Sequence, residues 1–346
     1  MKNNVKGHNV KGHNGKKPQF LAVTIHVDDL YEWVRVVTAM EAASLRKRAY
    51  KGTKILAPKW LYRGQANSAW EIASGFERIL LTKVPVSLQD KERYLRSIER
   101  VGLHNFKQWA DVTNSFVPRT SGEWLALMQH YGAPTRLIDF TEVPLIALAF
   151  ALEDNTQSEC DFAVWSVLRY SFNCGHAMET MIKGISDGNK KVELCDNMEF
   201  RVLADTYDEQ LLGKILDNDN MQRISPCILK YNPIQMNKRQ KLQRGLFLTC
   251  SHLSEKFMPL LHKWTDTCAA DLNNPELEMH VEEVLKCDGR FVDPVANAHL
   301  IKYVFDKSLR KEARMLLRCC NIGERTRYGD NDTVAAEAKE MMLETV

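Results

Sequence analysis

The feature that most constrains this chain is a polar stretch that runs directly into its most apolar segment. Residues 129–142 read QHYGAPTRLIDFTE, and residues 141–152 predict a buried helix rich in Ala and Leu. Polar groups this close to a core are stable only when they satisfy one another or face a pocket. The stretch therefore predicts one of two structures. It is either a turn, held by an Arg136–Asp139 pair with His130 bonded in the core, or the wall of a binding site.

Size and charge narrow the class of protein. The chain has 346 residues, of which 45% are hydrophobic and 26% charged, so it can bury the core of one large domain or two small ones. The net charge of +3 hides a gradient, because residues 1–70 hold 13 Lys and Arg against 4 Asp and Glu. This basic front favours a negatively charged partner.

Several classes are excluded by pattern. The apolar run from Val143 to Leu152 is too short to cross a bilayer, and Met1–Lys17 has no apolar signal-peptide core. The nine cysteines include no Cys-x-x-Cys pair, which argues against zinc. We therefore expect a cytoplasmic protein with reduced thiols, no metal and no membrane partner.

The chain is expected to form a disordered basic tail over residues 1–18 and one α+β domain over residues 19–346. The tail repeats VKGHN directly, and residues 171–223 read as a polar, irregular insertion. Hydrophobic periodicity predicts strands at 20–25, 55–64, 161–167, 228–231, 246–249 and 301–305. It predicts helices at 29–40, 91–109, 124–130, 141–152 and 307–320.

A second chemical feature is the tetrapeptide Tyr62-Arg63-Gly64-Gln65, which places a guanidinium at a strand end. Arginine suits phosphate because its planar fork donates two parallel charged hydrogen bonds. Gly64 would let a ligand approach the backbone. The alternative is an ordinary surface or salt-bridged arginine.

Taken together, these segments resemble the FRG-domain family, named for an aromatic-Arg-Gly motif. The resemblance covers roughly residues 20–325. It is carried by YRGQ at 62–65, QHYG at 129–132, PTRL at 134–137, AVW at 163–165, and Arg239, Gln243, Gly245 and Phe247.

The family's layout is similar to that of ADP-ribosyltransferases of the arginine–serine–glutamate type. The resemblance implies a single mixed β core with flanking helices and NAD as the substrate. It implies NAD contacts from Tyr62, Arg63, Gly64, Gln65, Arg136, Asp139 and Thr141. It also implies catalytic roles for His130, Glu142 and Gln243, although Gln243 cannot act as a carboxylate.

The partner and the reaction stay open at this level. Basic clusters at 46–54 and 238–244 favour a nucleic-acid acceptor, RNA or DNA, over protein. The resemblance also implies a toxin of an anti-phage locus with a neutralising antitoxin protein. Two alternatives remain: a non-catalytic module that binds a nucleotide or nucleic acid, and a hydrolase using His130 with Asp139 or Glu142. Gly-x-Gly-x-x-Gly, Gly-x-Ser-x-Gly and P-loop motifs are absent from the sequence.

Overall fold

The structure is a computed structural model that describes residues 21–46, 60–85, 90–110, 117–168, 198–217, 226–233, 238–264, 277–280 and 298–323. The predicted tail at 1–18 and most of the predicted insertion at 171–223 lie outside these residues. So does most of the basic cluster at 46–54.

The described strands form one eight-stranded mixed sheet in the order β5-β6-β3-β2-β4-β8-β1-β7. Neighbouring strands are antiparallel from β5 to β8, whereas β1 is parallel to both β8 and β7. This confirms the expected α+β class. The strands are β1 (Leu21–Val27), β2 (Trp60–Gln65), β3 (Ile138–Thr141), β4 (Phe162–Leu168), β5 (Ile228–Tyr231), β6 (Gly245–Cys250), β7 (Leu277–His280) and β8 (Ala298–Phe305).

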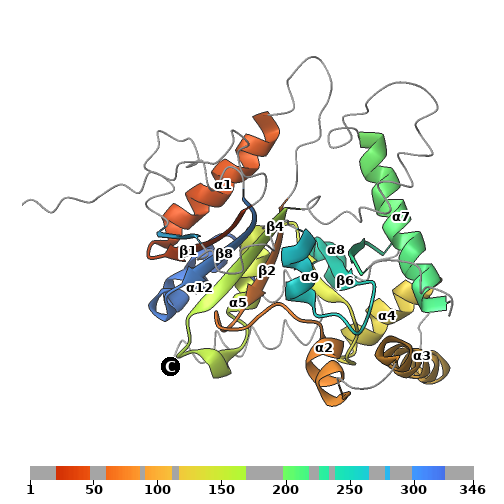
Figure 1. The fold of residues 1–346 in the computed structure, drawn as a ribbon. Helices are drawn as coiled ribbons and strands as arrows, with labels where there is room; N and C mark the ends of the chain where they lie inside the picture. Colours follow the sequence, from red (N-terminus) through yellow and green to blue (C-terminus); the bar gives the residue numbers. More distant parts are fainter. Residues whose placement is uncertain are drawn as a thin grey trace, which may run out of the picture.

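Helices cover the sheet in groups (Figure 1). Helices α3, α4 and α7 lie at the β6 end of the sheet, and α1 and α12 lie beside β1 and β8. The described helices are α1 (Leu30–Arg46), α2 (Gly75–Ile79), α3 (Lys91–Trp109), α4 (Ser121–His130), α5 (Pro144–Ala151), α7 (Met198–Asp217), α8 (Lys238–Gln243), α9 (Phe257–Trp264) and α12 (Arg310–Cys319).

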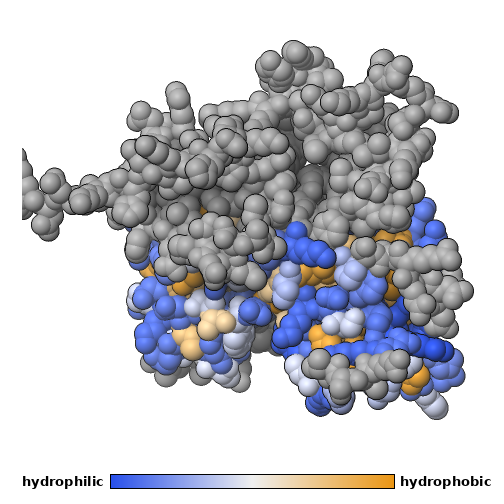
Figure 2. Space-filling model, viewed as in Figure 1, coloured by the Kyte–Doolittle hydropathy of each residue, from blue (hydrophilic) through white to orange (hydrophobic). Residues whose placement is uncertain are grey.

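Alternation along β2 divides the core between the two faces of the sheet. Trp60 and Tyr62 pack in the cluster built with α1, α5 and α12, whereas Leu61 packs in the cluster built with α9. Successive side chains of a strand point to opposite faces, so Arg63 shares the face of Leu61. Figure 2 shows mostly hydrophilic side chains on the described surface in this view, broken by small hydrophobic patches.

Most predicted elements are confirmed, and two need correction. The helix expected at 141–152 begins at Pro144, because residues 138–141 pair as β3. The irregular insertion is wrong for Met198–Asp217, which forms α7. Leu211, Leu212, Ile215 and Leu216 of this helix lie in the core with α3, α4 and β5.

N-terminal caps fix the starts of helices α1 and α4. Asp29 accepts hydrogen bonds from the amides of Tyr31 and Glu32 at the start of α1, as expected for an N-cap. Thr120 and Glu123 form a reciprocal capping box at the start of α4. Among the residues described, no helix is both long and apolar enough to span a bilayer.

Candidate functional site

The site begins where two central strands separate. Strands β2 and β3 are joined through one residue pair, Tyr62 with Thr141, whereas β2 and β4 pair at six positions. Arg63 follows that single pair, and its Nη1 donates a hydrogen bond of 2.6 Å to the backbone oxygen of Asp139. The guanidinium therefore bridges β2 and β3 just where their pairing stops.

Arg63 carries a positive charge that the described residues leave largely unneutralised. Its Nε is buried without a hydrogen-bond partner, and its one hydrogen bond within the described chain goes to a neutral carbonyl. Burial lowers the pKa of Arg63; the charge of Asp139 opposes this shift and that of Arg78 adds to it. Arg63 as a whole is half-buried, but its buried, unpaired Nε attracts an anion, because the anion restores the stabilisation lost with water.

A chain of side-chain hydrogen bonds positions the carboxylate of Asp139. Gln129 Nε2 donates to Asp139 Oδ2 at 2.8 Å, and Gln129 Oε1 accepts from the hydroxyl of Thr135. The same hydroxyl accepts from the amide of Leu137 at 3.2 Å. Asp139 itself is exposed, so its carboxylate stays open to a ligand.

The segment that follows Gln129 ends helix α4 in a defined turn. Gly132 adopts φ +84°, its amide donates to the oxygen of Gln129, and the amide of Ala133 donates to that of Met128. These two bonds are a Schellman motif, which favours glycine at the left-handed position. The turn leaves His130 and Tyr131 exposed, with their rings edge to face at 5.4 Å between centroids.

The other end of β3 meets the turn between α8 and β6. Thr141 Oγ1 donates to the backbone oxygen of Gln243 at 2.6 Å and accepts from the amide of Val143 at 3.1 Å. The amide of Glu142 donates to the backbone oxygen of Arg244 at 3.3 Å. The Thr141 hydroxyl and the backbones of Glu142 and Gln243 are thus brought together.

Gln243 is a second donor without an acceptor. Its side chain is 8% exposed, and its Nε2 has no hydrogen-bond partner among the described residues. The neighbouring Arg244 has φ +45°, an uncommon conformation for a non-glycine residue. Buried donors without an acceptor are rare in proteins, and a bound water, ion or ligand is one way in which they are satisfied.

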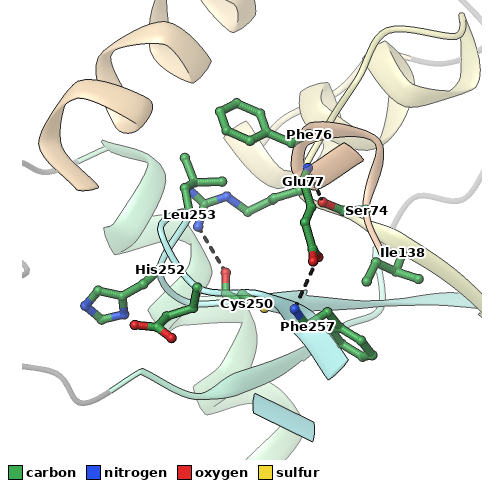
Figure 3. A pocket seen from close by; sticks show the side chains of 10 residues that line it. Ser74, Phe76, Glu77, Ile138, Cys250, His252, Leu253 and Phe257 are labelled. Atoms are coloured by element: carbon green, nitrogen blue, oxygen red, sulfur yellow. Dashed lines mark hydrogen bonds between the residues drawn. The ribbon is translucent and has the colours of Figure 1, made fainter. Parts of the chain in front are cut away.

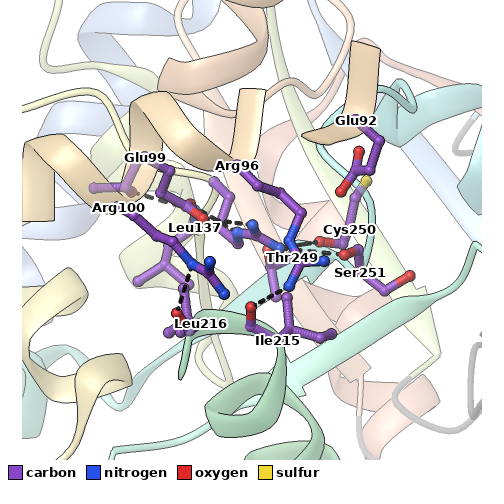
Figure 4. A network of polar contacts seen from close by, with 12 residues as sticks. Glu92, Arg96, Glu99, Arg100, Leu137, Ile215, Leu216, Thr249, Cys250 and Ser251 are labelled. Atoms are coloured by element: carbon purple, nitrogen blue, oxygen red, sulfur yellow. Dashed lines mark hydrogen bonds and ion pairs between the residues drawn. The ribbon is translucent and has the colours of Figure 1, made fainter. Parts of the chain in front are cut away.

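Arg136 does not belong to this site, which corrects its expected role at the NAD diphosphate. Its side chain is 2% exposed, and its Nε and Nη2 bind the two carboxylate oxygens of Glu99 at 2.7 and 2.5 Å. Its Nη1 donates to the backbone oxygens of Cys250 and Ser251, completing the network in Figure 4. Burial lowers the pKa of Arg136, but Glu99 outweighs it and the net shift is upward.

Tyr62 and Gln65 also serve the fold. The Tyr62 ring is fully buried, and its hydroxyl donates to Glu41 Oε1 at 2.9 Å. Gln65 accepts from Trp165 Nε1 at 2.6 Å and donates to the oxygen of Glu71 at 3.1 Å. Both side chains use their polar atoms in hydrogen bonds within the fold, so the expected NAD contacts are not supported for them.

Gly64 is needed for packing against α5, and this replaces its expected role of letting a ligand approach the backbone. A Cβ at this position would lie 1.9 Å from the backbone oxygen of Ala147 and 2.6 Å from the nitrogen of Ala151. The backbone of α5 therefore occupies the space next to Gly64 in which a ligand was expected. Close helix-to-strand packing of this kind needs glycine on one side and small residues on the other.

Comparison with protein families adds one decisive observation to this geometry. Residues 58–160 match the model of the FRG domain. This FRG segment holds β2, β3 and helices α2 to α5, and therefore Arg63, the Gln129–Asp139 pair and Thr141. The FRG part of the sequence-based resemblance is thus confirmed over residues 58–160, and the match does not extend to Arg239, Gln243, Gly245 and Phe247. No curated protein and no solved structure matches the chain.

The FRG segment and residues 250–257 together form a small pocket that Arg63 does not line (Figure 3), with walls that include Ser74, Glu77, Arg136, Ile138 and Phe257. Glu77 Oε2 accepts from the amide of Phe257 at 3.2 Å, which ties α2 to the first turn of α9. Burial raises the pKa of Glu77, and the hydrogen bond from Phe257 only partly opposes it.

Sequence reasoning left Gln129 and Thr135 without roles, although both lie in the motif that it singled out. Gln129 is the link between the end of α4 and Asp139, and Thr135 fixes the amide orientation of Gln129. Gln129 lies six residues before Thr135 and ten before Asp139, and these spacings could not reveal the link, because it depends on a turn that folds Thr135 back against α4.

Proposed function

We propose that this protein is an NAD-dependent ADP-ribosyltransferase that modifies a macromolecule, with nucleic acid, RNA in particular, favoured over protein. The observation that supports this most is the guanidinium of Arg63, held at the β2–β3 opening with a buried, unpartnered Nε. A diphosphate supplies the anion that this cation lacks.

The corner formed by Thr141, Glu142 and Gln243 suits the reacting end of NAD. In the proposed reaction the bond between the ribose C1′ and the nicotinamide nitrogen breaks, and nicotinamide leaves with the electron pair. Positive charge develops on the ribose, so a carboxylate or amide oxygen beside it stabilises the transition state. Glu142 and the amide oxygen of Gln243 are assigned this role, and Thr141 orients the ribose or carboxamide.

The acceptor step needs a base. An acceptor hydroxyl or amine forms the new bond to C1′, and its proton passes to a neighbouring side chain. Glu142 is our first assignment, because its backbone is already tied to the α8–β6 turn. His130 is the second candidate, at the exposed end of α4.

Charge around the corner favours a polyanionic acceptor. Helix α8 carries Lys238, Arg239 and Lys241 with no acidic residue, and Arg244 follows in the turn. Lys241 and Arg244 are exposed. This group adjoins Gln243 in the sequence, so an acceptor backbone held there would lie near the reacting end of NAD.

The test measures two products from one incubation: free nicotinamide, and label transferred from adenine-labelled NAD to RNA or to protein of a bacterial extract. Arg63→Met, which keeps the bulk of the side chain, should lower both by at least about a hundredfold. Arg35→Met, an exposed arginine on α1, is the matched control and should change neither. Turnover that survives Arg63→Met in a folded protein would refute the proposal.

A second candidate, a non-catalytic binding module, is favoured by one observation: an amide at Gln243, which cannot act as a carboxylate base. It predicts NAD or nucleic-acid binding that depends on Arg63, with nicotinamide release no faster than in buffer. Release without any labelled adduct would instead indicate a hydrolase.

The proposed role in a toxin–antitoxin pair rests on modification of an essential acceptor. Expression in a bacterial host should stop growth, and Arg63→Met should restore it while the protein accumulates to the same level. Equal toxicity of the two proteins would contradict this role, without bearing on the assay in solution.

A further inference from the structure

Two aromatic rings of the FRG segment stand largely in solvent. Trp109, the last residue of α3, is 86% exposed, and Tyr131, just after α4, is 68% exposed. Single exposed hydrophobic residues are common on protein surfaces. These two belong to a larger group of rings at neighbouring helix ends, which we call the aromatic platform: Phe106, Trp109, Trp124, His130 and Tyr131.

Ring contacts connect the platform. Phe106 packs edge to face on Trp124 at 6.3 Å and lies tilted against Tyr131 at 6.2 Å, and Tyr131 in turn meets His130. Trp109 follows Phe106 by three residues, so the two lie side by side on α3. Phe106 and Trp124 are partly buried against the core and support the rings that face outward.

The platform is held rigidly. The Schellman motif at Gly132 fixes the backbone of Tyr131, since the amides of Tyr131, Gly132 and Ala133 all donate to carbonyls of α4. Exposed rings with fixed backbones lose little entropy when a flat ligand stacks on them. Leaving both rings in water forgoes the free energy of burying them, which a stacked ligand would recover.

One cation lies beside the rings of α3. Lys107 stands between Phe106 and Trp109 in the sequence, and its Nζ donates to Ser121 Oγ at 3.0 Å. The other Lys and Arg residues of α3 lie in the first half of the helix. Rings interleaved with cations are the combination that binds single-stranded nucleic acid, because bases stack and the backbone is neutralised.

Hydrogen bonds connect the end of α4, beside the platform, to the proposed catalytic site. Gln129, one residue before His130, bonds to Asp139, and the backbone oxygen of Asp139 accepts from Arg63. We propose that the aromatic platform stacks unpaired bases of the acceptor and so makes single-stranded nucleic acid the substrate. This inference rests on the proposed function for the identity of the acceptor, but binding can be measured without it.

The experiment measures binding of the full chain to a fluorescent single-stranded RNA of about 12 nucleotides, without NAD. Tyr131→Ala and Trp109→Ala should each weaken binding about tenfold, whereas Tyr131→Phe, which keeps the ring, should not. Tyr94→Ala is the matched control, since this tyrosine of α3 is 50% exposed but lies outside the platform. A duplex of the same sequence should bind more weakly, because its bases are already stacked.

Salt dependence separates stacking from charge. Tyr131→Ala should keep the wild-type slope of log affinity against log salt, whereas Lys107→Gln should reduce it by about one. Binding that is unchanged in both ring variants, or equally weakened by Tyr94→Ala, would overturn the inference. The inference would also be overturned if the wild-type chain bound a protein but not the single-stranded RNA.

Failure of this inference is distinguishable from failure of the proposed function. Ring-dependent RNA binding with no nicotinamide release would leave the platform standing and refute only the transferase. Nicotinamide release with RNA binding that ignores Tyr131 and Trp109 would do the reverse.

Discussion

Two arginines of the FRG segment differ in how their charge is satisfied. Arg136 is enclosed by the Glu99 carboxylate and two backbone carbonyls, so both sides of its ion pair are complete. Arg63, on the strand beside β3, has one carbonyl and a buried Nε with no partner. Neither YRGQ at 62–65 nor PTRL at 134–137 contains a signal that distinguishes these two environments.

The difference separates a structural charge from a binding charge. In a buried ion pair with both partners present, each charged group already has its partner, so a ligand must displace one of the two groups to bind. A cation whose buried Nε has no hydrogen-bond partner keeps binding capacity for an anion. The four predictions below test this contrast, from the largest expected effect to the smallest.

Arg136→Met should destabilise the protein by about 3–5 kcal/mol, because it leaves the carboxylate of Glu99 buried and unpaired. Urea unfolding followed by circular dichroism measures this. The double variant with Glu99→Leu removes both charges and should recover most of the loss. A loss below about 1 kcal/mol in the single variant would mean that this pair does not carry the structural charge.

Gly64→Ala should cost about 3 kcal/mol, because the added Cβ meets backbone atoms of α5 that cannot move aside. Gly102→Ala, on the open surface of α3, is the matched control and should stabilise the protein by about 0.5–1 kcal/mol. Equal tolerance of both changes would show that β2, the strand that carries Arg63, does not pack closely on α5. The position described for Arg63 would then lose its support.

Arg63→Met should change the free energy of unfolding by less than about 1 kcal/mol, since the lost hydrogen bond is offset by the removal of a poorly solvated charge. Pyrophosphate should raise the melting temperature of the wild type and leave this variant unchanged. If Arg63→Met unfolds the protein as Arg136→Met does, the contrast between the two arginines fails.

Glu77 provides the smallest test, in the pocket that Arg136 helps to line. Its pKa is raised in the folded state, so its contribution to stability is full below the ordinary glutamate pKa of about 4.3 and is lost as pH rises through the raised value. Glu77→Gln should therefore match the wild type near pH 4 and exceed it by less than about 1 kcal/mol at pH 7. Parallel stability curves across this range would contradict the expected linkage.

The sequence predicted the parts of this fold that local pattern determines. The periodicity of residues 91–109 matches α3 at both ends, and alternation located β4 and β5 closely. Strand β3 was missed because its four residues lie inside a polar motif and pair only through distant segments. Helix α7 was missed because residues 171–223 were interpreted as one polar segment, whereas Leu211, Leu212, Ile215 and Leu216 contact the core formed by α3, α4 and β5.

The site was predictable in its members more than in their roles. The motif pointed to Arg63, Asp139 and Thr141, which the structure does bring to neighbouring positions on β2 and β3. It also pointed to Arg136, whose partner Glu99 lies 37 residues away and carries no local signal. Whether an arginine faces a ligand or a carboxylate depends on tertiary packing, and spacing along the chain does not encode it.

The order of strands has a consequence for how the molecule folds. Strand β1 lies between β8 and β7, so the first described strand pairs only with strands that are distant in the sequence, and such long-range pairing is slow to form. The FRG segment ends before β4, the strand with the longest pairing to β2. The position of Arg63 therefore depends on a strand outside the FRG segment, and that segment alone would leave β2 with its single pair to β3.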